Sequence, residues 1–210
     1  MPGACREMGT RERQATLANY LRAVGELATF DVGDRDYGGL LPSTVWLTAP
    51  SWGGFLRAQL EASLRGFADR VASDFPRLQA TVTRLEAVLD DRFQRDQSGL
   101  VHGDYLPQNV LVSEDCSVSA VFDFGSHSMV GDTRLDICTA VGFLELDVSF
   151  TAADTSYLRE IVAAQQTADE AWVSSVYEAY SAIVLGSAYS SHAGVYRWCV
   201  ETLEATSGRF

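Results

Sequence analysis

Two carboxylates and a carboxamide lie close together in a stretch of otherwise apolar sequence. Asp104 and Asn109 belong to the run L-V-H-G-D-Y-L-P-Q-N-V-L-V at Leu100–Val112, and Asp123 belongs to V-F-D-F-G at Val121–Gly125. A carboxylate at the start of a loop can accept a hydroxyl proton, and carboxylate and amide oxygens are the ligands that Mg²⁺ prefers. Phosphoryl transfer needs these parts, because it depends on an oriented acceptor and on neutralised phosphate charge. We therefore predict Asp104 as a base and Asn109 and Asp123 as Mg²⁺ ligands.

Short strands are expected to position these side chains. Runs of β-branched and other apolar residues, separated by a loop and a turn, predict strands over 100–102, 110–112 and 118–123. The loop between the first two strands directs Asp104 and Asn109 to one side, and Asp123 leaves the third strand beside them. Side chains at the ends of rigid strands keep their geometry better than side chains on free loops.

Apolar residues at helical spacing predict helices through most of the remaining chain. The first follows Thr10, a possible cap, and carries Leu17, Leu21, Val24 and Leu27 on one face. A loop rich in glycine and aspartate is expected over residues 31–50. Further helices are expected after Ser51, after Pro76, and over residues 136–146, 155–164, 168–188 and 195–203. The predicted fold is α+β and mostly helical, with a small β insert that carries the polar residues.

Composition limits the classes of protein. The 210 residues are enough for one large domain or two small lobes with a real core. A hydrophobic fraction of 47% argues against disorder. The net charge of −12 argues against nucleic acid as a partner. An acidic surface would suit a small cationic substrate, and it is also a common way of staying soluble.

The sequence predicts a cytoplasmic protein. Its four cysteines, Cys5, Cys116, Cys138 and Cys199, contain no C-x-x-C pair, which is typical of reduced thiols. The N-terminal residues lack the apolar run of a signal peptide. No run of about 18 apolar residues is present, so a membrane span is not expected.

In the types and the order of its motifs, the chain resembles the aminoglycoside phosphotransferase family. These kinase-like enzymes phosphorylate antibiotics and other small metabolites. The matching segments are His102–Asn109, Phe122–Gly125 and Gly131–Asp136. The resemblance implies that Asp104 is the catalytic aspartate and that Asn109 and Asp123 bind magnesium. It implies structural roles for His102, Gly103, Gly125, Asp132 and Asp136, the last two bracing the catalytic loop and opening the next helix.

The same resemblance implies a domain layout. Residues 1–210 would form a single large lobe, with a catalytic and metal-binding core over residues 100–136 and helical, substrate-side regions over residues 51–92 and 150–204. The family's N-terminal nucleotide-binding lobe, with its strand lysine, has no counterpart here, and all sixteen basic residues are arginines. An arginine is not an equivalent replacement for that lysine.

Several functions therefore remain open. As an enzyme, the protein would transfer the γ-phosphate of ATP, or of another nucleoside triphosphate, to a hydroxyl of a small molecule, as in antibiotic resistance. A small lobe from another polypeptide, or a second copy of the chain, could complete it. The chain could also be the large-lobe portion of a normal enzyme. Alternatively, it is a truncated, catalytically inactive, pseudokinase-like protein that binds a small molecule or a partner protein, the latter through an exposed apolar face.

The substrate-binding residues are unknown from sequence. Four acidic residues in the C-terminal half could attract the amines of a cationic substrate: Asp147, Asp154, Asp169 and Glu170.

Overall fold

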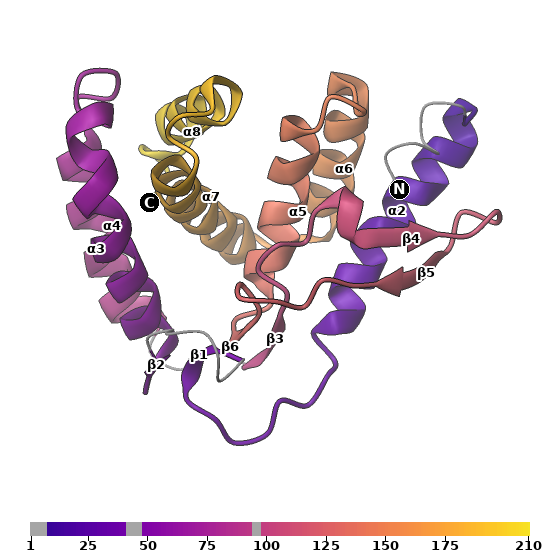
Figure 1. The fold of residues 1–210 in the computed structure, drawn as a ribbon, viewed down its shortest axis with the longest axis horizontal. Coiled ribbons are helices and arrows are strands. Elements are labelled where there is room, and N and C mark those ends of the chain that lie inside the picture. Colours follow the sequence, from indigo (N-terminus) through magenta and orange to yellow (C-terminus); the bar gives the residue numbers. More distant parts are fainter. Residues whose placement is uncertain (1–7, 41–47, 94–97) are drawn as a thin grey trace. The chain divides into compact units, whose positions relative to one another are not determined.

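The computed structural model describes residues 8–40, 48–93 and 98–210. These residues form two compact units (Figure 1). Unit 1 contains residues 8–35, 39–40 and 98–167, and unit 2 contains residues 36–38, 48–93 and 168–210. Helices dominate and all strands are short, so the predicted mostly helical α+β fold is confirmed. Within these residues, no helix is both long and apolar enough to cross a membrane.

Unit 1 contains the predicted β insert and three helices. Its helices are α2 (Thr10–Leu27), α5 (Arg134–Leu146), α6 (Ala152–Gln165) and the short 3-10 helix η1 (Pro107–Asn109). Its strands are β3 (Gly99–Val101), β4 (Val110–Val112), β5 (Val118–Val121) and β6 (Met129–Gly131). Strand β4 pairs antiparallel with β5, as the sequence predicts, and β3 pairs antiparallel with β6. Strand β6 was not expected, because three residues carry too little pattern to identify a strand without its partner.

The apolar face of α2 forms one side of the unit 1 core. Leu17, Leu21, Val24 and Leu27 are buried, which confirms the predicted stripe, and Tyr20 is buried with them. They pack with buried residues of the loop after β3 and of β4, α5 and α6, namely Tyr105, Val110, Ala140, Val141, Leu144 and Leu158. This packing brings a helix from early in the sequence against the polar motif.

The predicted cap of α2 is wrong by one position. Thr10 is the first helical residue, and Gly9 precedes it in an extended conformation. The Gly9 N–H donates to the Glu12 carboxylate at 3.1 Å, so the helix start is stabilised by that side chain rather than by a Thr10 hydroxyl.

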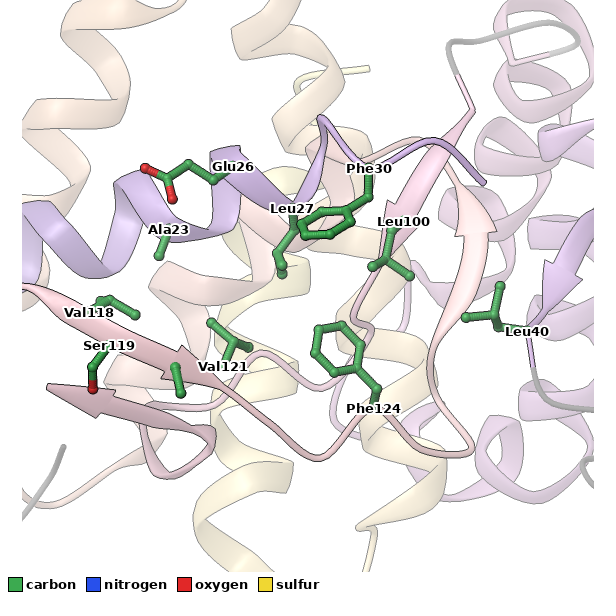
Figure 2. Close-up of a pocket in the computed structure, with 11 residues that line it drawn as sticks. Ala23, Glu26, Leu27, Phe30, Leu40, Leu100, Val118, Ser119, Val121 and Phe124 are labelled. Carbon is green, nitrogen blue, oxygen red and sulfur yellow. The ribbon is translucent and has the colours of Figure 1, made fainter. Parts of the chain in front are cut away.

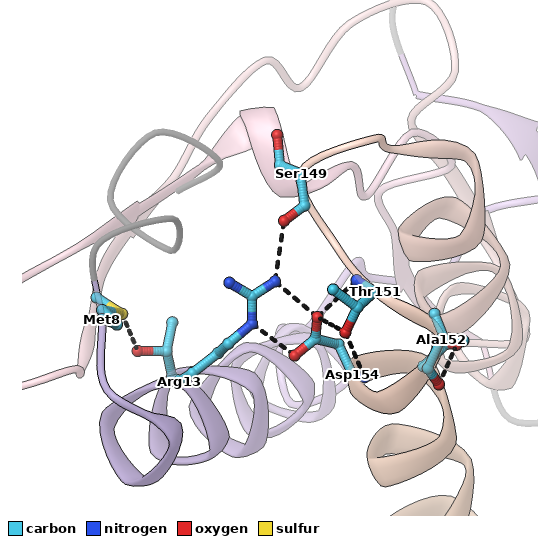
Figure 3. A network of polar contacts seen from close by, with 8 residues as sticks. Met8, Arg13, Ser149, Thr151, Ala152 and Asp154 are labelled. Atoms are coloured by element: carbon cyan, nitrogen blue, oxygen red, sulfur yellow. Dashed lines mark hydrogen bonds and ion pairs between the residues drawn. The ribbon is translucent and has the colours of Figure 1, made fainter.

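A partly buried ion pair joins α2 to the start of α6 (Figure 3). Arg13 donates from Nε and Nη2 to the two oxygens of Asp154, each at 2.6 Å, and from Nη2 to the Ser149 carbonyl at 2.9 Å. Asp154 also accepts from the backbone N–H and the hydroxyl of Thr151, the cap of α6. Burial alone would raise the pKa of Asp154, but these donors outweigh it and lower the pKa to about 2.

Unit 2 is built from four helices and a short strand pair. Its helices are α3 (Trp52–Val71), α4 (Leu78–Arg92), α7 (Ala168–Ala188) and α8 (Ala193–Thr206). Helix α3 begins after Ser51 as predicted, and Ser51 is its cap, since its hydroxyl accepts from the Gly54 N–H at 3.2 Å. Strands β1 (Tyr37–Gly39) and β2 (Thr48–Ala49) pair antiparallel inside the predicted loop, of which residues 41–47 lie outside the described residues.

Three of the four cysteines, Cys116, Cys138 and Cys199, are buried, as small apolar side chains usually are. Cys5 lies outside the described residues.

Candidate active site

The loop after β3 folds back on itself between Asp104 and Asn109. The Asp104 carbonyl accepts from the Leu106 N–H at 2.7 Å and from the Asn109 side-chain amide at 2.9 Å. Since Nδ2 of Asn109 is the donor, the orientation of its amide is fixed and Oδ1 is available as a ligand. Asn109 is almost fully buried, whereas Asp104 is partly exposed. A substrate could therefore reach Asp104.

Asp123 lies beside Asn109 through the β4–β5 pairing. Val110 pairs with Val121, and the Phe122 N–H donates to the Asn109 carbonyl at 3.0 Å. Asp123 follows directly, with an exposed side chain and a φ of +68°. A residue other than glycine with positive φ is uncommon, and such strained positions often occur at functional sites. The structure thus brings Asp104, Asn109 and Asp123 into one region of unit 1.

Asp136 accepts hydrogen bonds from the backbone of the loop after β3. This residue, in the first turn of α5, accepts from the His102 N–H at 2.6 Å and from the Gly103 N–H at 2.9 Å. Burial raises the pKa of its carboxyl to about 6, against the two N–H donors, which act to lower it. The contact joins the loop to a helix that begins more than thirty residues later.

His102 connects the two halves of the motif. Its Nδ1 accepts from the Asp104 N–H at 3.3 Å, so its Nε2 is the protonated nitrogen and donates to the Phe122 carbonyl at 2.9 Å. Its ring lies 4.6 Å from the ring of Phe124, centroid to centroid. With both nitrogens engaged with backbone, His102 is placed to hold the loop rather than to accept a substrate proton.

The two glycines of the motif differ in their constraints. Gly103 has a φ of +75°, and a Cβ at this position would lie 2.1 Å from the His127 carbonyl oxygen. Gly125 lies where a Cβ would meet nothing closer than 3.8 Å. The structure therefore requires glycine at position 103, but it imposes no such steric requirement at position 125.

Asp132 is engaged at the start of α5. Its carboxylate accepts from the backbone N–H of Arg134 at 3.0 Å and from the Arg134 guanidinium. The side chain is buried, and it satisfies a backbone donor in the first turn of the helix.

The donor set fits a magnesium ion. Asn109 supplies an amide oxygen and Asp123 a carboxylate, and Mg²⁺ commonly takes one or two protein oxygens with the rest from phosphate and water. Within residues 8–40, 48–93 and 98–210, no group of three or more His, Cys, Asp and Glu side chains could hold a metal. A cation at this site would therefore depend on nucleotide oxygens as well as on protein.

Two features of the site were not predicted from the sequence. Tyr20 exchanges hydrogen bonds with Tyr105, the residue after Asp104. Gln108 of the loop donates to the Asp147 carboxylate, at the end of α5, at 2.8 Å. The helical spacing of Tyr20 from Leu17 was a usable signal for the first contact, but no sequence pattern indicated the second.

Comparison with known proteins identifies the family and shows similar folds. The family model described as "Phosphotransferase enzyme family" matches residues 4–176. The crystal structure of aminoglycoside phosphotransferase APH(4)-Ia has a similar fold, with a TM-score of 0.70 and 16% identity, covering 98% of this chain and 68% of that chain. A thermostable mutant of APH(4)-Ia in ternary complex with AMP-PNP and hygromycin B gives a TM-score of 0.69 and 14% identity, with the same coverage. None of the curated proteins matches the sequence.

Proposed function

Because this chain belongs to the phosphotransferase enzyme family, we propose that it transfers the γ-phosphate of ATP, or of another nucleoside triphosphate, to a hydroxyl of a small molecule. Asp104 is the base, and Asn109 and Asp123 hold Mg²⁺. The observation that carries this assignment is the pair of contacts that orients Asn109 on Asp104 and brings Asp123 next to Asn109.

Each residue of the loop has its own role in the proposed reaction. The acceptor oxygen forms a bond to the γ-phosphorus while the bond from that phosphorus to the bridging oxygen of the β-phosphate breaks, which leaves the nucleoside diphosphate. Asp104 receives the hydroxyl proton, and its partly exposed position gives the acceptor access. Asn109 and Asp123 would hold a Mg²⁺ ion, which when bound would supply neutralisation of the charge on the phosphate oxygens. Asp136 and His102 keep the loop backbone in position.

A cationic, aminoglycoside-like molecule is the proposed substrate class. APH(4)-Ia has been crystallised with hygromycin B. Of the acidic residues considered from sequence, Asp154 pairs with Arg13 and Asp169 pairs with Arg92. Asp147 accepts only from Gln108 and from the Ser149 N–H among the described residues, so its charge is not neutralised. Asp147 is thus the carboxylate best placed to attract an ammonium group near the catalytic loop.

The nucleotide site needs a cation to bind the phosphates. No lysine of this chain can supply it, because the sequence contains no lysine. We therefore propose that a partner polypeptide completes the phosphate-binding site. The competing function is a small-molecule or partner-binding protein without transfer activity, and ATP binding distinguishes the two.

The test is calorimetric titration of the purified chain with ATP and Mg²⁺. Binding that is lost in Asp123→Asn and retained in Asp91→Asn, an exposed aspartate of α4, supports the metal site. Transfer of labelled γ-phosphate to hygromycin B is then measured, with Asp104→Asn expected to abolish transfer while ATP binding persists. Absence of ATP binding in the wild type would exclude a stand-alone phosphotransferase. A partner-completed enzyme and the binding protein would then remain, and ATP binding after addition of the partner polypeptide would distinguish them.

A further inference from the structure

Helix α2 is bonded to two segments of the candidate site through consecutive residues. Tyr20 exchanges hydrogen bonds with Tyr105, next to Asp104 in the loop after β3. Asn19 donates from its side-chain amide to the Cys116 carbonyl, in the turn between β4 and β5, at 2.7 Å. The same helix therefore holds the loop that carries the proposed base and the tip of the hairpin formed by β4 and β5.

The β4–β5 hairpin determines where Asp123 lies. Its strands form a two-stranded sheet of their own, and such a hairpin is only marginally stable without packing against other elements. At its base, Asn109 is fixed by the bond from its amide to the Asp104 carbonyl, and the Phe122 N–H donates to the Asn109 carbonyl. The base is thus a pivot, and the tilt of the hairpin about it sets the position of Asp123 relative to Asp104.

Apolar packing alone does not fix this tilt, because a cavity of about 460 Å³ lies between the C-terminal part of α2 and strand β5 (Figure 2). Ala23 and Leu27 of the helix and Val121 of the strand line it, together with Phe30 and Phe124. Side chains across a cavity lack the close contacts that hold packed elements in one arrangement. A directional hydrogen bond between α2 and the hairpin therefore contributes what packing does not.

The turn between β4 and β5 is held rigidly around the Cys116 carbonyl. Cys116 is buried and has a φ of +67°, which is uncommon for a residue other than glycine. The Ser113 N–H donates to the Ser117 carbonyl at 2.9 Å, and the Cys116 N–H donates to the Ser113 carbonyl at 3.0 Å. Asp115 accepts from the N–H of Ser117 at 3.0 Å and from its hydroxyl at 2.6 Å. Because the turn is fixed by its own bonds, a bond at its tip acts on the whole hairpin.

We propose that Asn19 is a positioning residue for Asp123: its hydrogen bond to the Cys116 carbonyl sets the tilt of the β4–β5 hairpin and so holds Asp123 in place for Mg²⁺. The inference rests on the proposed function, since the position of Asp123 matters in this way only if it is a metal ligand. Asn19 itself touches neither metal nor nucleotide in this role and acts through the hairpin.

The test compares three variants. Asn19→Leu has a similar volume but no donor, and Asn19→Gln keeps an amide donor. Gln59→Leu is the control, because it removes a part-buried hydrogen bond with Tyr180, between α3 and α7 of unit 2. Calorimetric titration with ATP at a series of Mg²⁺ concentrations gives the Mg²⁺ concentration at half-maximal binding. Asn19→Leu is expected to raise this concentration about fivefold, which is the worth of one ordinary hydrogen bond. Asn19→Gln should raise it less, and Gln59→Leu should leave it unchanged.

A second measurement needs no nucleotide. Hydrogen exchange followed by mass spectrometry should show faster exchange over residues 110–123 in Asn19→Leu than in the wild type, with β3 and β6 unchanged. Gln59→Leu should exchange like the wild type in all of these segments.

Three outcomes overturn the proposal. They are unchanged hairpin exchange in Asn19→Leu, an unchanged Mg²⁺ requirement in Asn19→Leu when the wild type binds ATP, and an effect of Gln59→Leu equal to that of Asn19→Leu. The last outcome would assign the effect to lost stability alone. Absence of ATP binding by the wild type removes the proposed function, and hydrogen exchange then decides separately whether Asn19 fixes the hairpin.

Discussion

Tyr20 and Tyr105 each donate a hydrogen bond to the backbone of the other. The Tyr20 hydroxyl donates to the Tyr105 carbonyl at 2.7 Å, and the Tyr105 hydroxyl donates to the Tyr20 carbonyl at 2.9 Å. Both side chains are fully buried, with ring centroids 4.7 Å apart. Burial raises the pKa of both hydroxyls, so they remain protonated donors. Because Tyr105 follows Asp104, the pair fixes the catalytic loop against α2.

Tyr20→Phe should destabilise the protein by about 1–3 kcal/mol, since it leaves the buried Tyr105 carbonyl without this donor while it preserves the ring. Urea unfolding of the wild type and the variant measures the difference. Tyr105→Phe removes the reciprocal bond and should cost a similar amount. A loss below about 0.5 kcal/mol in both variants would show that the reciprocal bonds do not anchor the loop.

Gly103→Ala should be far more damaging than Gly125→Ala. At position 103 the new methyl group would meet the His127 carbonyl, and the positive φ alone costs an L-residue about 1–2 kcal/mol. We expect Gly103→Ala to lose at least about 2 kcal/mol of stability, or to shift the loop and abolish binding of Mg²⁺ and ATP. Gly125→Ala should unfold at nearly the wild-type urea concentration. Equal effects in the two variants would contradict this reading of the loop.

Local patterns in the sequence identified the helices and the polar motif. Helix α7 has the predicted bounds of residues 168–188, and α3 begins after Ser51 as predicted, because apolar stripes at helical spacing are local features. The sequence also predicted that Asp104 and Asn109 belong to one loop between two strands. The position of Asp123 beside Asn109 needed only the pairing of two adjacent short strands.

Contacts between distant segments could not be predicted in the same way. Strand β6 is defined by its pairing with β3, about thirty residues earlier, and the Arg13–Asp154 pair joins residues 141 positions apart. Neither has a local sequence signal, because each depends on how the helices pack. The apolar cavity between α2 and β5 has the same origin, since Phe30 and Phe124 are ordinary apolar residues until the fold brings them together.

The Arg13–Asp154 pair gives a defined pH dependence. The pKa of Asp154 is lowered from 3.8 to about 2 in the folded protein, so its contribution to stability is fully present above pH 3.8 and is lost as the pH falls towards 2. The difference in unfolding free energy between the wild type and Asp154→Asn should therefore be constant above about pH 5 and shrink below about pH 4. Unfolding in urea across this range measures it. In an Arg13→Gln background, the pH-dependent part of this free-energy difference should be much smaller. If it keeps its full size, the lowered pKa of Asp154 is caused by a group other than Arg13.

Asp147→Asn should weaken binding of a cationic substrate without loss of nucleotide binding. The substitution removes the charge and leaves one oxygen, which can accept from Gln108 or from the Ser149 N–H but not from both. Urea unfolding of the variant measures the stability that is lost with the second hydrogen bond. With hygromycin B as the probe, a single partly exposed ion pair predicts an affinity loss of up to about fivefold, which becomes smaller at high salt. Calorimetric titration at low and high salt measures both effects. Glu145→Gln is the matched control, because Glu145 lies on the same helix and already pairs with Arg159. Weakening by Glu145→Gln equal to that by Asp147→Asn would indicate a general effect of negative charge rather than a specific contact at Asp147.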